Sequence, residues 1–151
     1  MLIRNKIQIS AAPEKIWGLV TDPLVMKTWN PRIVEAVPVT VGKPKANSQY
    51  RIRYNLGRRE NNYLAEIMEY EEFSRLVLHL EGGNLPKKGY IQEIYELTLN
   101  NKGTLLTRTI LIGQARTGLL SGLFLRLNNM IGRSSGKKNL NRLRALAESG
   151  V

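Results

Sequence analysis

The stretch from residue 32 to residue 113 restricts the possible folds more than any other part of this sequence. In six segments of it, apolar residues alternate with polar ones, or β-branched and aromatic residues accumulate, and both patterns are typical of strands. Turn-forming glycine, asparagine and proline separate the segments, so consecutive strands are expected to pair antiparallel, as a meander. The predicted strands are Arg32–Val39, Gln49–Leu56, Asn62–Tyr70, Ser74–Glu81, Gly89–Leu99 and Thr104–Gly113.

Other elements precede and follow the predicted meander. Residues Leu2–Ile9 alternate isoleucine with charged and polar residues and predict a first strand. Pro13 suits the first turn of a short helix that ends before Asp22, and a second helical turn is predicted over Leu24–Thr28. Leucines at helical spacing in the last part of the chain predict one long helix over Gly118–Glu148.

The order of these elements predicts an α+β fold in which a curved, seven-stranded antiparallel sheet wraps around the long C-terminal helix. Two short helices follow the first strand. The apolar stripe of the long helix changes phase along its length, so we expect a bend over Gly132–Gly136. At 151 residues the chain is long enough to build a core around a cavity, and we expect a single ligand-binding domain over residues 1–151.

The residues that many enzymes and metal sites need are scarce in this sequence. It contains no cysteine, which excludes disulfides and thiolate chemistry. Its one histidine, His79, is predicted to point outward from the sheet beside Glu81, where it cannot join a histidine-rich metal site or a Ser-His-Asp triad. We therefore expect no metal and no cofactor. Acid–base chemistry by Glu66, Glu69 or Glu93 stays open.

Nothing in the sequence indicates export or membrane insertion. The first ten residues alternate in polarity and lack the apolar block of a signal peptide. No apolar run approaches the roughly 20 residues that a membrane span needs. Together with the absence of cysteine, these features favour a soluble protein of the cytoplasm.

Several short stretches spread over the chain form a pattern shared with a known superfamily. They are Ser10–Pro13, Ile16-Trp17, Leu19, Asp22, Trp29–Pro31, Tyr70–Leu76 and Gly103-Thr104. Their order and spacing resemble those of the START-like (SRPBCC) superfamily, especially its polyketide cyclase/dehydrase and lipid-transport branch. The resemblance covers the whole chain and implies a helix-grip fold. It does not select one reaction, because members of this superfamily include carriers, cyclases, hydrolases, co-chaperones and ligand sensors.

Strand alternation and helical spacing predict which side chains face the interior of such a fold. Trp17 lies on the buried face of its helix and is expected in the core. For Trp29, in a proline-bounded bend, two interpretations stay open: lining the mouth of a cavity, or plain packing. The other apolar and tyrosine residues predicted to line the cavity are Tyr50, Ile52, Tyr54, Leu78, Tyr95, Leu123 and Leu127.

The predicted hairpin of the last two strands carries two charged residues on its inner face. If residues 100–103 form a tight two-residue turn, position 93 lies opposite 110 and position 95 opposite 108, so Glu93 and Arg108 become diagonal neighbours. An unpaired charge in the interior costs several kcal/mol, so the two are expected to pair. We predict that this pair recognises the polar group of a ligand. A purely structural ion pair, and a bulge that turns Arg108 to solvent, stay open.

Positive charge is concentrated near the C-terminus. The chain carries a net charge of +11, and residues 116–151 contain seven basic residues and one acid. On a regular helix Arg126, Arg133, Lys137 and Arg144 fall in one stripe. Such a ridge suits an anionic ligand or an anionic membrane surface. Nucleic acid is the weakest of the possible partners, because exposed aromatic residues do not alternate with the basic ones. A solvated helix face is the plain alternative.

These observations favour a binding protein over an enzyme. We predict that the sheet and the C-terminal helix enclose a mostly apolar cavity that binds a hydrophobic small molecule or lipid, for transport or sensing. One alternative is an enzyme of the cyclase/dehydrase type that works without metal or thiol. Another is an interaction module, or a protein that docks on anionic membranes through the basic helix.

Overall fold

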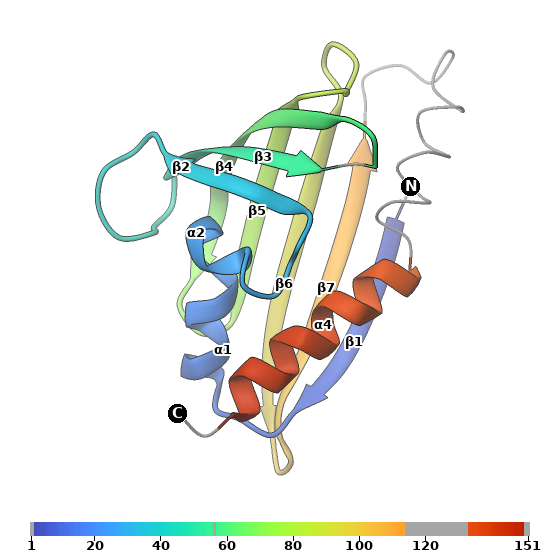
Figure 1. The fold of residues 1–151 in the computed structure, drawn as a ribbon. Coiled ribbons are helices and arrows are strands. Elements are labelled where there is room, and N and C mark those ends of the chain that lie inside the picture. The colour runs from blue at the N-terminus through green and yellow to red at the C-terminus, as the bar shows by residue number, and fades with distance from the viewer. Residues whose placement is uncertain (1, 56, 114–132, 150–151) are drawn as a thin grey trace.

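The computed structural model describes residues 2–55, 57–113 and 133–149, and in this part of the chain the strands form one sheet (Figure 1). The strand order is β1-β7-β6-β5-β4-β3-β2, so hairpins connect neighbours from β2 to β7, and β1 pairs with β7. Every pair is antiparallel. The strands are β1 (Leu2–Ile9), β2 (Ile33–Pro38), β3 (Gln49–Asn55), β4 (Glu60–Glu71), β5 (Arg75–Gly82), β6 (Tyr90–Asn100) and β7 (Gly103–Gly113).

Three helices are described beside this sheet. They are α1 (Pro13–Val20), α2 (Pro23–Met26) and α4 (Arg133–Glu148). Figure 1 shows the sheet curving behind α4, with α1 and α2 on the same side. The predicted α+β fold, a curved seven-stranded sheet around a C-terminal helix, is thus confirmed. No helix in the described ranges is both long enough and apolar enough to cross a membrane.

The C-terminal helix is described over its second half. Residues 118–132 of the predicted helix lie outside the described residues. From Arg133 onward α4 runs without interruption through Gly136, so the helix does not break within residues 133–136, and the predicted bend between its two halves stays a prediction.

Proline starts both short helices. Pro13 and Pro23 each occupy the first turn, where a backbone N–H would have no partner within the helix. Asp22 caps α2, because its side chain accepts a hydrogen bond from the Leu24 N–H at 3.0 Å. These residues fix the turn between α1 and α2, which sets the course of the bend that carries Trp29.

The core lies between the inner face of the sheet and the helices. From α4, Leu140, Leu143 and Ala147 are buried against it. Trp17 of α1 is also buried, as predicted, and donates its ring N–H to the Tyr70 hydroxyl at 3.2 Å. Burying one large apolar side chain stabilises a fold by roughly 1.5–3 kcal/mol, so this layer holds the helices on the sheet.

The outer face of the sheet carries the histidine and two of the glutamates considered for acid–base chemistry. His79 lies on this face, as predicted, with its Nε2 3.0 Å from Glu81. Glu66 is opposite His79 in the β4–β5 register, and residues directly opposite share a face. Glu69 pairs with Arg75 at 2.8 Å and is also on the outside. An acid–base role inside the fold is therefore wrong for Glu66 and Glu69.

One corner of the fold joins three distant parts of the chain. Gly103, at the start of β7, has a φ of +119°, and a side chain there would collide with the carbonyl of Ile9 at the end of β1. Glu148, at the end of α4, accepts a hydrogen bond from the Ser10 N–H at 2.8 Å. The end of β1, the β6–β7 turn and the end of α4 are therefore held together.

Candidate functional site

Glu93 of β6 and Arg108 of β7 form an ion pair inside the fold. Glu93 lies opposite Ile110 and Tyr95 lies opposite Arg108, as predicted. The Arg108 Nη2 is 3.2 Å from the Glu93 Oε2, and the two residues are only 3% and 6% exposed. The predicted pairing is confirmed, and a bulge that turns Arg108 to solvent is wrong.

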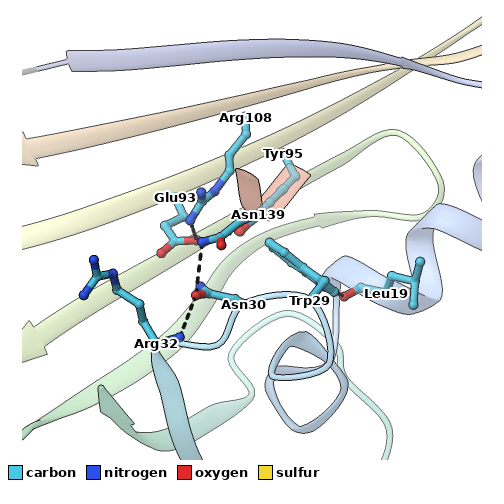
Figure 2. A network of polar contacts seen from close by, with 8 residues as sticks. All are labelled: Leu19, Trp29, Asn30, Arg32, Glu93, Tyr95, Arg108 and Asn139. Carbon is cyan, nitrogen blue, oxygen red and sulfur yellow. Dashed lines mark hydrogen bonds and ion pairs between the residues drawn. The ribbon is translucent and has the colours of Figure 1, made fainter. Parts of the chain in front are cut away.

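Aromatic rings surround this pair. The Tyr95 hydroxyl donates to the Glu93 Oε2 at 2.6 Å, so one carboxylate oxygen accepts hydrogen bonds from both Tyr95 and Arg108. The Arg108 guanidinium carbon lies 5.8 Å from the Tyr95 ring centroid and 5.9 Å from that of Trp29, within the range of cation–π attraction. Figure 2 shows Glu93, Tyr95 and Arg108 projecting from the sheet toward the loop that carries Trp29.

One donor of this cluster is left over. The Arg108 Nε is buried and has no hydrogen-bond partner in the described part of the chain. Native proteins leave few buried donors unpaired, because each one costs about 1–3 kcal/mol. An acceptor atom of a ligand, such as a carbonyl or carboxylate oxygen, would satisfy this N–H.

Burial also shifts the proton affinities of the cluster. It raises the pKa of Tyr95 well above its usual value, although the charge of Arg108 partly offsets the rise. Burial likewise raises the pKa of Tyr54, and the nearby Glu93 adds to the effect. For Arg108, burial lowers the pKa, but Tyr95 and Glu93 outweigh it and hold the pKa above its usual value. At neutral pH the tyrosines are therefore uncharged hydrogen-bonding groups, and Arg108 is a fixed cation.

Trp29 packs inside the fold. It is 0% exposed, and its ring N–H donates to the Leu19 carbonyl at 2.8 Å. A buried indole needs such a partner, and this one holds the bend against α1. Packing of Trp29 in the core is confirmed, and its contact with a ligand stays a prediction.

The remaining predicted lining residues fall into three groups. Those that are buried in the core are Tyr50, Ile52 and Leu78. Tyr54 is half-buried and packs against the same core. Leu123 and Leu127 lie outside the described residues. The contact of all these side chains with a ligand stays a prediction.

Two asparagines near the ion pair were missed by the sequence analysis. Asn139 of α4 is 6% exposed and donates to the Asn30 side-chain oxygen at 3.2 Å (Figure 2). The same oxygen accepts the Arg32 N–H at 3.2 Å, so it ties α4 to the bend. Asn139 lies four residues before the buried Leu143, and this helical spacing is the signal that could have identified it.

The basic ridge predicted on the C-terminal helix is described only in part. Lys137 and Arg144 are exposed on α4. Arg126 lies outside the described residues, and Arg133 is the first residue of α4. The ridge as a whole, and its use on an anionic membrane, stay predictions.

Comparisons with known proteins agree with this architecture. Residues 2–148 match the model of a family described as polyketide cyclase/dehydrase and lipid transport. Among solved structures, the Zhui aromatase/cyclase from Streptomyces sp. R1128 has a TM-score of 0.78 at 12% identity, covering 98% of this chain and 93% of that one. No curated protein matches the sequence.

Two further structures are similar over nearly their whole length. The protein TTHA0849 from Thermus thermophilus has a TM-score of 0.75 at 16% identity, covering 99% of both chains. The ginseng major latex-like protein 151 from Panax ginseng has a TM-score of 0.70 at 13% identity, covering 99% of this chain and 96% of that one. At these identities the structures establish the fold alone, whereas the family model matches almost every residue. The chain therefore belongs to the polyketide cyclase/dehydrase and lipid transport family, within the START-like (SRPBCC) superfamily of helix-grip folds.

Proposed function

We propose that the protein binds a hydrophobic small molecule or lipid between the inner face of the sheet and its helices. The family description names lipid transport and polyketide chemistry, and both involve largely apolar molecules. The inner face presents mainly isoleucine, leucine and tyrosine side chains. Small-molecule sites commonly combine such an apolar lining with a few polar groups that orient the ligand.

The observation that carries this proposal is the buried Arg108. Its ion pair with Glu93 balances its charge but leaves the Nε without an acceptor in the described chain. A carbonyl, hydroxyl or carboxylate oxygen of a ligand would complete the hydrogen bonding. In this proposal Arg108 binds the polar end of the ligand, while Glu93 and Tyr95 position the guanidinium.

The experiment compares two arginine variants on opposite faces of the sheet. Binding of the fluorescent fatty acid cis-parinaric acid is measured for the wild-type protein, Arg108→Leu and Arg75→Leu. We expect Arg108→Leu to weaken binding about tenfold, because it removes a charged hydrogen-bond donor. Arg75→Leu, the matched change on the outer face, is expected to bind within about twofold of the wild type.

Two outcomes would contradict the proposal at different levels. If the two variants bind cis-parinaric acid with equal affinity, Arg108 does not contact the ligand, but the proposal of apolar binding still stands. Failure of the wild-type protein to bind the probe, together with no apolar compound in native mass spectra of freshly purified protein, would reject hydrophobic binding itself.

A second candidate is a cyclase or dehydrase, and the Tyr95–Glu93 hydrogen bond of 2.6 Å favours it. A buried carboxylate can take up a proton, and a fixed cation such as Arg108 can stabilise an enolate oxygen that forms beside it. Turnover of a poly-β-ketone thioester by the wild type, lost in Glu93→Gln with the fold retained, would support this candidate. Absence of turnover by the wild type would reject it in favour of binding.

A further inference from the structure

A groove lies between β1 and α4, which run side by side in Figure 1. Its volume is about 310 Å³. Residues 5–8 of β1 line one wall, and Lys137, Leu140, Asn141 and Arg144 of α4 line the other. Their spacing places these four on one face of the helix. The groove adjoins the Arg108 cluster, because Asn5 lies opposite Arg108 in the β1–β7 register, but none of Glu93, Tyr95 and Arg108 lines it.

The charged residues that line this groove are all basic. Lys6 comes from β1, and Lys137 and Arg144 come from α4. None of the three forms an ion pair within the described ranges, whereas Arg53 and Arg75 each contact two carboxylates. Cations that gather without acidic partners create a positive potential, and this potential attracts anions.

Uncharged donors add to the wall formed by β1. Asn5 is 7% exposed, yet its side-chain amide makes no hydrogen bond to any residue that the structure describes. Gly136 makes room for it, since a Cβ at that position would lie 2.7 Å from the Asn5 Nδ2. Because β1 is an edge strand, every second backbone N–H of β1 points away from β7. Within the described residues, an amide that solvent reaches and that has no protein partner, beside three cations without carboxylate partners, suits a ligand that accepts hydrogen bonds and carries negative charge.

We propose that this groove binds a phosphate monoester, either a small free molecule or the headgroup of a lipid. The two cations of the helix wall, Lys137 and Arg144, match the charge of a phosphate dianion, Lys6 adds a third positive charge from β1, and lysine and arginine are the usual partners of phosphate. A volume of about 310 Å³ is at the lower end for small-molecule sites, which suits a group the size of glycerol phosphate. Ile7 and Leu140 provide an apolar wall for the carbon atoms of the ester. The inference does not depend on ligand binding at Arg108.

The first experiment follows glycerol 3-phosphate by NMR titration. In the wild type, the backbone amides of residues 5–8 and 137–144 are expected to shift. The double variant Lys6→Gln/Arg144→Gln removes one exposed cation from each wall and is expected to bind about tenfold more weakly. The matched control, Arg58→Gln/Arg59→Gln, removes two exposed arginines between β3 and β4, away from β1 in the strand order, and has the same net charge. It is expected to bind like the wild type.

A second experiment distinguishes the two sources of the phosphate. Phosphatidylcholine vesicles with and without phosphatidic acid are sedimented with the wild type and both double variants. Binding that requires phosphatidic acid and is lost only in Lys6→Gln/Arg144→Gln identifies a lipid headgroup, whereas binding of glycerol 3-phosphate alone identifies a free ester. The proposal is overturned if neither probe binds in the groove, or if both double variants lose affinity equally, because net charge would then explain the effect.

Discussion

The two faces of the sheet use the same charged groups in different surroundings. On the outer face, Arg75 contacts Glu69 at 2.8 Å and Glu96 at 3.1 Å, and these side chains are between 32% and 50% exposed. On the inner face, Arg108 contacts one carboxylate, that of Glu93, at 3.2 Å, and the two side chains are 4% and 7% exposed. Arg75, which water can solvate, therefore has two carboxylate partners, whereas the buried Arg108 has one.

This difference indicates that the inner ion pair is not explained by stability. An exposed ion pair contributes about 0.2–1 kcal/mol. A buried pair loses several kcal/mol per ion on leaving water, and the attraction offsets this loss only when geometry and hydrogen bonding are complete. The hydrogen bonding of Arg108 is incomplete, because its Nε has no acceptor in the described chain. The proposed role in ligand recognition would account for so costly a pair in the interior.

The largest expected effect comes from separating the inner charges. Glu93→Leu should lower the free energy of unfolding by about 3–5 kcal/mol, because it leaves Arg108 buried without a counter-charge. Urea unfolding measures this loss. The double variant Glu93→Leu/Arg108→Leu removes both charges and should recover most of the stability. A double variant as unstable as the single one would show that lost packing, and not the charge, causes the effect.

Alkaline pH extends the comparison to a buried tyrosine. Burial raises the pKa of Tyr63 to about 12, although a hydrogen bond with Asn84 partly offsets the rise. In the unfolded chain tyrosine titrates near pH 10, so the unfolded chain loses this proton first. The contribution of Tyr63 to the free energy of unfolding is complete below about pH 10 and is lost as the pH rises through about 12, an expected decrease of about 2.7 kcal/mol.

Urea unfolding of the wild type and Tyr63→Phe across this pH range checks the prediction. The stability of the wild type should fall more steeply than that of the variant, which has no hydroxyl to titrate. Parallel curves would contradict a raised pKa at this position.

A smaller loss is expected when the hydroxyl of Tyr95 is removed. Tyr95→Phe keeps the ring but deletes the O–H that donates to Glu93, and should cost about 1.5 kcal/mol, as is typical for a hydrogen bond to a charged group. Thermal unfolding measures the change. Tyr90→Phe, beside His79 on the outer face, is the matched control and should change stability by less than about 0.5 kcal/mol. Equal losses of stability in the two variants would show that a tyrosine hydroxyl contributes no more on the inner face than on the outer face.

The smallest effect is expected on the outer face. Arg75→Gln removes the contacts with Glu69 and Glu96 and should cost less than about 1 kcal/mol, and this cost should shrink as salt is added. Urea unfolding at low and high ionic strength measures both. A loss above about 2 kcal/mol that does not depend on salt would show that the outer ion pairs of Arg75 stabilise the fold as strongly as a buried pair. The two faces would then not differ in this way.

The inner hairpin could be predicted from the sequence because its geometry depends on local rules. A period of two and a two-residue turn determine which residues are opposite each other, and these rules brought Glu93 beside Arg108. The same rules located the strands to within a few residues. They also placed His79 on the outer face.

The bend and its contacts could not be predicted in this way. Trp29 lies in a segment without periodicity, and its position depends on the hydrogen bond to Leu19 across the α1–α2 turn. Asn139 meets Asn30 only because α4 crosses the sheet at that point. Helical spacing could place Asn139 on the buried face of α4, but its partner could not be predicted, because such contacts arise from the packing of distant elements.

The corner that joins Ser10 to Glu148 has a consequence for synthesis of the protein. Strand β1 pairs with β7, whose residues are about 100 positions downstream, so it has no partner while β2 to β6 emerge from the ribosome. The hairpins between can form as they are made, but β1 must stay accessible until β7 appears, and α4 follows later still. A nascent chain therefore carries an unpaired strand through most of its translation, which is the period in which chaperones would protect it.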